Sequence, residues 1–298
     1  MTACISIITP SYNQGKYIER TIQSVMSQNV PGLEYLVIDG GSTDDTVEIL
    51  KRHGDRFDWL SEKDRGHADA INKGIARSMG PIVGWLNSDD VYYPGALATV
   101  LEFFDAHPDV DVVYGDANHI DERDAIIEKY PTEPWSWERL LETCFISQPA
   151  AFFRRSVVDR HGLIDQQAAP SIDYEYWVRL GKNGVRFEYF PRLLAATRLH
   201  DEAFTVGSRV ACHAATNNFM REHFGKTPDP WIFSYAHAVA ETKGFRRSEP
   251  FRFAVVVSAV SWYASLRWNH SLSGNVLRTT GGWISGNASR VLRETFAQ

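Results

Sequence analysis

Short runs of apolar and β-branched residues alternate with longer amphipathic segments along the first 115 residues of the chain. Glycine, proline, asparagine or aspartate follows most of the short runs, which is typical of strands that end in turns. The expected strands are residues 4–9, 34–39, 57–60, 82–86 and 110–114. Apolar residues at helical spacing predict helices over residues 16–28, 42–53, 68–78 and 94–106. Strands that alternate with helices of this length predict an α/β fold with a mostly parallel sheet.

The pattern changes after residue 115. Short strands over residues 126–130, 150–153, 187–190 and 194–199, with helices over 135–143 and 174–183, predict an α+β half. Strand patterns fade after about residue 205, and helices are expected over residues 209–224, 231–244, 251–268 and 276–296. We therefore expect one domain over residues 1–205, with halves at 1–115 and 116–205, followed by a helical region over residues 206–298.

Composition narrows the class of protein. The chain has 298 residues, of which 44% are hydrophobic, and its net charge is −6, so a protein that grips nucleic-acid backbone is not favoured. Its three cysteines, Cys4, Cys144 and Cys212, have no metal-ligand spacing, which favours a reducing cytoplasm. The N-terminus resembles no targeting signal, and no window reaches the length of apolar sequence that a membrane span needs.

Polar residues that directly follow strands are the first candidates for chemistry, because ligands of such sheets bind beyond the carboxyl ends of the strands. The strongest of these segments is residues 85–90, WLNSDD, where an apolar strand meets the adjacent carboxylates of Asp89 and Asp90. Adjacent carboxylates repel each other unless a cation compensates, and Mg²⁺ or Mn²⁺ often bridges carboxylates to a diphosphate. The alternative is a plain turn, since Asn, Ser and Asp all favour turns.

Four further parts of the sequence have both a functional and a structural interpretation: Asp39, the helix face at residues 69–73, Asp173 and His200. Asp39, followed by Gly40 and Gly41, is placed to accept hydrogen bonds from ribose hydroxyls or a base edge, or to form a strand–turn–helix joint. No dinucleotide or P-loop fingerprint is present there. Asp69, Asn72 and Lys73 share one helix face, which either lies along a nucleotide or forms an exposed polar stripe.

Asp173 stands at an expected helix start, where it serves as an N-cap or as a general base. His200 follows a strand, where a lone histidine is more often structural than a ligand.

Together these segments resemble the family 2 glycosyltransferases, which have a GT-A fold. The resemblance covers residues 3–205 and rests on seven motifs in order, at residues 7–13 (IITPSYN), 37–46 (VIDGGSTDDT), 69–74 (DAINKG), 84–90 (GWLNSDD), 148–150 (QPA), 162–165 (GLID) and 173–177 (DYEYW). It implies a Rossmann-like, mostly parallel sheet with an acceptor-binding α+β half. It also implies an inverting transfer from a nucleotide-diphosphate sugar to an acceptor hydroxyl.

The resemblance assigns roles residue by residue. Nucleotide-sugar contacts fall on Thr9, Pro10, Tyr12, Asp39, Asp69, Asn72, Asn87, Ser88 and Asp90. Asp89 takes Mn²⁺ or Mg²⁺, and His200, with Arg198 nearby, lies where some relatives place an additional metal or phosphate ligand. Asp173 matches the general base of the family, and Gln148 and Trp135 are assigned to the acceptor site.

Two positions depart from the family pattern. Asn87 replaces the first aspartate of the D-x-D motif, which removes one negative charge from the metal site. Ile172 replaces the glutamate before the catalytic aspartate, which leaves the base itself intact.

Two other functions compete with sugar transfer. Nucleotidyl transfer needs a glycine- and arginine-rich first loop, and residues 9–13 have neither residue. A degenerate sugar-nucleotide-binding protein without transfer activity is the second alternative. The donor is expected to be a UDP- or dTDP-sugar, and the acceptor a glycan or lipid-linked saccharide of a bacterial surface polymer.

The helix expected at residues 251–266 is apolar nearly all round, and arginines flank it. It either packs on the catalytic domain or in a homodimer interface, or lies on the inner face of the cytoplasmic membrane, with Trp262 and Trp268 as anchors.

Overall fold

The computed structural model describes residues 4–200 and 208–296, with side chains through Asn287. The chain divides into two compact units. The sheet unit comprises Met1–Leu140, Cys144–Gln167 and Tyr176–Ala203, and the helical unit comprises Leu141–Thr143, Ala168–Glu175 and Phe204–Gln298. The domain boundary expected at residue 205 falls outside the described residues and stays a prediction.

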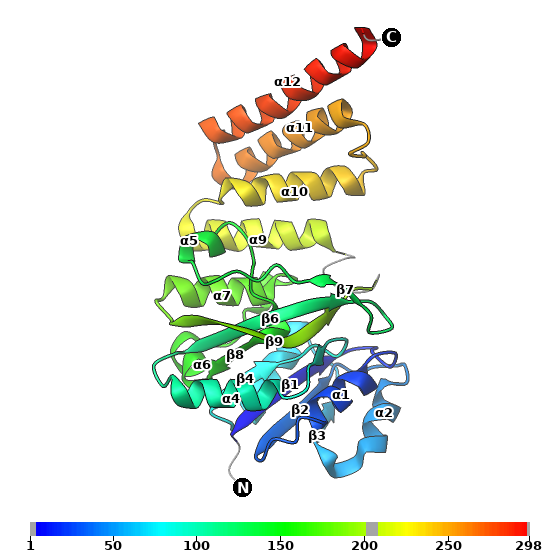
Figure 1. Cartoon of the computed structure of the whole chain (residues 1–298), viewed down its shortest axis with the longest axis vertical. Helices are drawn as coiled ribbons and strands as arrows, with labels where there is room; N and C mark the ends of the chain where they lie inside the picture. Colours follow the sequence, from blue (N-terminus) through cyan, green and yellow to red (C-terminus); the bar gives the residue numbers. More distant parts are fainter. Residues whose placement is uncertain (1–3, 201–207, 297–298) are drawn as a thin grey trace. The chain divides into compact units, whose positions relative to one another are not determined.

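A single mixed sheet forms the sheet unit (Figure 1). Its strands are β1 (Ile5–Ser11), β2 (Leu33–Asp39), β3 (Asp58–Ser61), β4 (Ile82–Trp85), β5 (Val91–Tyr92), β6 (Val112–Ile120), β7 (Ile126–Lys129), β8 (Ala151–Arg154) and β9 (Phe187–Arg198). Their order is β3-β2-β1-β4-β8-β6-β9-β5, with β7 paired to β6. Strands β1 to β4 are parallel, as expected, whereas β8 runs antiparallel to both β4 and β6.

Three of the four helices of the first half connect the parallel strands, and the fourth leads from β5 to β6. The four are α1 (Ile18–Met26), α2 (Thr46–His53), α3 (His67–Arg77) and α4 (Ala96–Ala106). Helix α1 buries Ile18, Ile22 and Val25 in the core that it shares with β1 and α4. Burial of such apolar side chains is the main stabilisation of an amphipathic helix. Three more helices follow: α5 (Trp137–Leu140), α6 (Arg155–His161) and α7 (Ile172–Lys182). The boundary between the two units passes through α7.

Strand β9 is one continuous strand where the sequence predicts two, at 187–190 and 194–199. Pro191 lies between the two predicted strands, and proline has no N–H to donate to a ladder. The structure accommodates it at an irregularity, where Phe190 pairs with Gly115 but Leu193 pairs with Asp116. The extra residues bulge out of the ladder, and the strand continues to Arg198.

Four helices make up most of the helical unit: α9 (Arg209–Phe224), α10 (Asp229–Thr242), α11 (Pro250–Asn269) and α12 (Gly274–Phe296). They follow one another as successive layers, with α11 between α10 and α12 (Figure 1). Trp268 is buried, and its indole N–H donates to Asn218 Oδ1 at 2.8 Å. The expectation that Trp268 anchors a surface helix is therefore wrong. No helix in the described ranges is long and apolar enough to cross a membrane.

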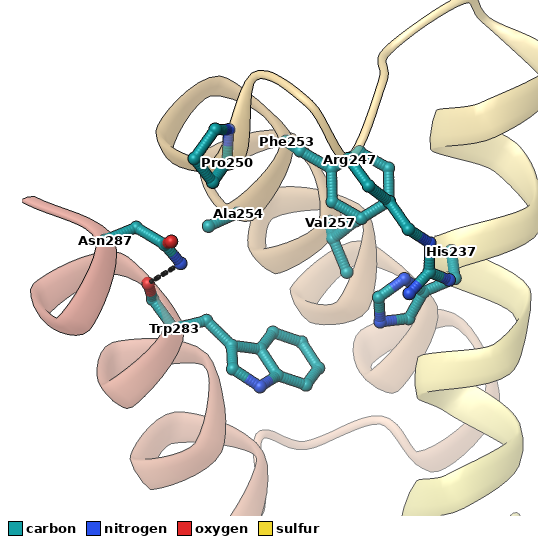
Figure 2. Close-up of a pocket in the computed structure, with 8 residues that line it drawn as sticks. All are labelled: His237, Arg247, Pro250, Phe253, Ala254, Val257, Trp283 and Asn287. Atoms are coloured by element: carbon teal, nitrogen blue, oxygen red, sulfur yellow. Dashed lines mark hydrogen bonds between the residues drawn. The ribbon is translucent and has the colours of Figure 1, made fainter. Parts of the chain in front are cut away.

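A cavity of about 260 Å³ lies between α10, α11 and α12 (Figure 2). Its lining residues are His237, Arg247, Pro250, Phe253, Ala254, Val257, Trp283 and Asn287. The Arg247 guanidinium lies 5.5 Å from the centre of the Phe253 ring and pairs with Glu241. The layers of the helical unit thus pack around a mostly apolar space that one paired arginine borders.

Gly74 allows α3 to approach β1. A Cβ added at Gly74 lies 2.3 Å from Ile8 Cγ2, which is fully buried. Overpacking costs about 1–3 kcal/mol and exceeds the ~1 kcal/mol that alanine gains over glycine in a helix. We expect Gly74→Ala to lower the free energy of unfolding by up to about 2 kcal/mol in urea denaturation. Gly281→Ala is the matched helical control, because nothing lies within 4 Å of its added Cβ, and a similar loss there would contradict this packing account.

Candidate active site

Three adjacent parallel strands end at one edge of the sheet. Ser11 of β1 pairs with Asp39 of β2, and Asp39 pairs with Ser61 of β3. The polar loops that the sequence singled out therefore leave the sheet at this edge. Thr9 and Pro10 are buried within β1, where Thr9 Oγ1 accepts a hydrogen bond from the Tyr35 hydroxyl at 3.2 Å. Tyr12, beyond the strand, is 59% exposed.

Asp39 is fully buried and organises the turn after β2. Its Oδ2 accepts the N–H groups of Gly41 and Ser42 at 3.1 and 3.0 Å and the Ser61 hydroxyl at 2.6 Å. Its Oδ1 accepts the Ser42 hydroxyl. Each carboxylate oxygen has two lone pairs, and Oδ1 accepts one donor, so Oδ1 retains one lone pair for a further donor.

Asp69 and Asn72 of α3 are both buried, and each has partners in the sheet unit. Arg65 donates to Asp69 Oδ1 at 2.8 Å, and this ion pair lowers the pKa of Asp69. Asn72 donates to the Ile164 carbonyl at 2.8 Å and accepts from the Ile164 N–H at 3.0 Å. The Asn72 amide thus connects α3 to the segment around Ile164. A nucleotide contact at Asn72 stays a prediction, and such a contact would compete with these hydrogen bonds.

The acidic segment at residues 87–90 is held from two sides. The Thr21 hydroxyl lies 2.9 Å from the Ser88 carbonyl and 2.8 Å from the Asp90 carbonyl. Asn87 Oδ1 lies 2.9 Å from His67 Nε2. Asp90 is 2% exposed and accepts the Arg198 N–H at 2.9 Å. Burial, together with the neighbouring charge of Asp89, raises the pKa of Asp90 well above its usual range.

Arg198 has a fully buried guanidinium that fixes this segment. It donates through Nε to the Asp89 carbonyl at 2.8 Å and through Nη1 to the Asp121 carbonyl at 2.7 Å. Its Nη2 pairs with Asp124 at 2.5 Å, and the guanidinium lies 5.2 Å from the centre of the Tyr17 ring. The sequence placed Arg198 near the site, but its role in holding the acidic segment becomes visible only in the structure.

His200 and Asp89 form the pair most suited to a divalent cation. His200 Nε2 lies 2.9 Å from Asp89 Oδ2, and the Asp89 side chain is 18% exposed. The contact is a hydrogen bond between the ring nitrogen and the carboxylate, and these are the two side chains that would hold Mg²⁺ or Mn²⁺. His200 Nδ1 is buried and has no partner among residues 4–200 and 208–296. In those same ranges no group of three or more His, Cys, Asp or Glu residues could hold a metal ion, so a cation at this pair would need further ligands from outside the protein.

Asp173 lies in the first turn of α7, in the part of that helix that belongs to the helical unit. It is half-buried between Ile172 and Tyr174, which are both buried. Burial raises its pKa, while backbone hydrogen bonds oppose the shift. A carboxylate with a raised pKa accepts a proton more readily near neutral pH.

The two residues assigned to the acceptor lie in well-packed surroundings. Gln148 donates to the Trp85 carbonyl at 2.7 Å, and its buried Oε1 has no partner in the described part of the chain. Trp135 stacks on Phe187 with ring centres 4.1 Å apart and also contacts Phe145. Gln148 thus offers an acceptor oxygen that a ligand hydroxyl can satisfy, whereas Trp135 already has an aromatic partner.

Residues 6–162 match the family model described as "Glycosyl transferase family 2". The chain therefore belongs to glycosyltransferase family 2.

Relatives agree with this assignment. An uncharacterized glycosyltransferase of Rickettsia typhi is 27% identical over 215 residues, which cover 67% of this chain and 65% of that protein. Chondroitin synthase of Escherichia coli is 29% identical over 202 residues, which cover 66% of this chain but 29% of the synthase. The chain thus spans less than two thirds of the length of either relative.

Solved structures confirm the expected GT-A fold. S. aureus TarS 1–349 in complex with UDP-GlcNAc gives a TM-score of 0.64 at 17% identity, covering 95% of this chain and 92% of that one. The mannosyltransferase PcManGT of Pyrobaculum calidifontis, in complex with GDP-Man and Mn²⁺, gives 0.60 at 18% identity, covering 98% and 81%.

The raised pKa of Asp90 predicts a pH-dependent stability. A carboxyl with a raised pKa in the folded state contributes stability at low pH that is lost as pH rises through that pKa. Asp90→Asn keeps an acceptor for the Arg198 N–H but cannot ionise. As the pH rises from about 5 to about 8, we expect the free energy of unfolding of Asp90→Asn, measured in urea, to increase relative to that of the wild type. Asp105→Asn, at an exposed position, serves as the control, and an equal difference at both pH values for Asp90→Asn would contradict the account.

Proposed function

We propose that this enzyme transfers a sugar, with inversion, from a UDP- or dTDP-sugar to a hydroxyl of a glycan or lipid-linked saccharide. The observation that carries the proposal is the Asp89–His200 pair, held at 2.9 Å beside a buried Asp90 in a family 2 fold. The nucleotide sugars named for TarS and PcManGT, and the synthase activity named for the chondroitin enzyme, support a nucleotide-sugar donor and a glycan acceptor.

Asp89 and His200 would hold Mn²⁺ or Mg²⁺. When bound, the ion supplies positive charge to the leaving diphosphate as a Lewis acid. Asn87 contributes no charge, so the protein provides a single ionised carboxylate to the cation, and the donor diphosphate supplies much of the remaining attraction. Asp90 supports the segment from behind through its bond to the Arg198 backbone.

The nucleotide lies, in this proposal, along the edge where β1, β2 and β3 end. The exposed ring of Tyr12 borders the base, with Thr9 and Pro10 shaping the strand behind it. Asp39 Oδ1 accepts one further donor from the base or ribose. Asp69, Asn72 and Ser88 complete this wall.

Asp173 is proposed as the general base. It takes the proton from the acceptor hydroxyl while the hydroxyl oxygen bonds to the anomeric carbon and the bond to the diphosphate breaks on the opposite face. One displacement with one base inverts the anomeric centre, and no second carboxylate nucleophile is needed. Gln148 Oε1 is the proposed contact for an acceptor hydroxyl, and Trp135 is assigned to the same region.

Replacement of Asp173 tests the assignment. Asp173→Asn keeps the shape of the side chain but removes its basicity, so turnover is expected to fall by at least roughly 10²-fold. Release of UDP or dTDP from a panel of donors with Mn²⁺ measures turnover, and calorimetry measures nucleotide affinity, which should not change.

The exposed Asp105→Asn variant is the matched control and should keep wild-type turnover. Residual activity of Asp173→Asn should also lose the rise with pH that titration of this carboxyl gives the wild type. Near-normal turnover in Asp173→Asn would refute the assignment. A wild type that binds UDP without consuming any donor would favour the degenerate binding protein.

A further inference from the structure

Helix α11 has one buried face and one exposed face, and the exposed face is mostly apolar. Its buried residues include Phe253, Val257, Ala264 and Trp268, which pack in the helical unit. At about 100° per residue, six exposed apolar side chains fall within an arc of about 120° along the helix, and the exposed Arg252 lies in the same arc at its first turn. This α11 stripe consists of Phe251, Val255, Ala259, Trp262, Tyr263 and Leu266.

Exposed apolar side chains concentrate on this stripe. Five of the twelve large apolar side chains exposed in the described part of the chain lie on it, and Tyr263 and Leu266 are 56% and 50% exposed. Scattered exposed apolar residues need no explanation, but a contiguous patch marks an interaction surface. Trp262 donates its indole N–H to Thr280 Oγ1 at 2.8 Å, so the ring is fixed at the edge of the stripe.

The charge around the stripe indicates the partner. Residues 244–298 carry seven arginines and two glutamates, although the whole chain has a net charge of −6. Arg267 and Arg278 are exposed, and neither forms an ion pair within the described residues. A two-fold contact between identical copies brings the same arginines together and is opposed by their repulsion. An anionic lipid surface attracts them instead.

We propose that the α11 stripe lies on the surface of an anionic lipid bilayer. The apolar side chains enter the boundary between headgroups and acyl chains, Trp262 and Tyr263 lie at the level of the headgroups, and the arginines contact lipid phosphates. The contact is interfacial, in keeping with the absence of a spanning helix from the described ranges. The inference rests on the helical unit alone and does not depend on the proposed function.

Vesicle flotation with the full chain tests the proposal. The wild type is expected to float with vesicles of phosphatidylcholine mixed with phosphatidylglycerol, and much less with phosphatidylcholine alone. The double variant Arg267→Gln, Arg278→Gln loses two positive charges. Each charge contributes about 1 kcal/mol to binding an anionic surface, so the partitioning of the protein onto the vesicles is expected to weaken about 30-fold. Tyr263→Ser with Leu266→Ser should also abolish flotation without unfolding the protein, because both side chains are exposed.

Ile126→Ser with Ile127→Ser is the matched control, since these two exposed apolar residues lie on β7 of the sheet unit and should not affect flotation. Melting temperatures and UDP binding of all variants report folding and the donor site separately from lipid binding. Failure of the wild type to float with anionic vesicles, or unchanged flotation of the stripe variant, overturns the proposal. A wild-type dimer in light scattering that the stripe variant dissociates, without any vesicle binding, assigns the stripe to a second copy instead.

Discussion

The proposed chemistry depends on one buried cation. The guanidinium of Arg198 has no exposed surface, and it holds the Asp89 carbonyl, the Asp121 carbonyl and the Asp124 carboxylate together. Its backbone N–H also fixes Asp90, so two bonds from one residue set the conformation of the acidic segment. A buried charge is costly unless it is paired, and the Asp124 carboxylate pairs with the guanidinium while two carbonyls accept from Nε and Nη1. Nη2 contacts Asp124 as an ion pair, without a hydrogen bond of its own among the residues that the structure describes. The Asp89 carboxylate is thereby left free to face solvent and His200.

Burial distinguishes the carboxylates of the site. Asp39 and Asp69 are buried, but neighbouring residues donate several hydrogen bonds to each carboxylate, and through these bonds they organise a turn and a helix contact. Asp90 and Asp173 are desolvated with fewer donors, which raises the pKa of each. Asp89 remains partly exposed beside a histidine. One residue type therefore provides structural support, a candidate metal ligand and a candidate base, according to its surroundings.

Local pattern predicted most of the elements but few of their long-range partners. Helix α9 begins and ends where the sequence predicts it, and Gly225 at its C-terminus is a local feature of the sequence. Local patterning predicts two strands in place of β9, whereas the bulge against β6, a long-range feature, lets one strand continue past Pro191. The hydrogen bonds of Arg198 could not be predicted from local sequence, because its partners Asp121 and Asp89 lie 77 and 109 positions away. Likewise, the pairing of Asn72 with Ile164 joins residues 92 positions apart.

The central claim is that Asp89 anchors a divalent cation that binds the donor diphosphate. Calorimetric titration of UDP into the wild type and into Asp89→Ala, each with Mn²⁺ and with EDTA, tests it most directly. The account predicts tight UDP binding only for the wild type with Mn²⁺, and weak binding in the other three titrations. Equal UDP affinity of the wild type in Mn²⁺ and in EDTA would contradict it.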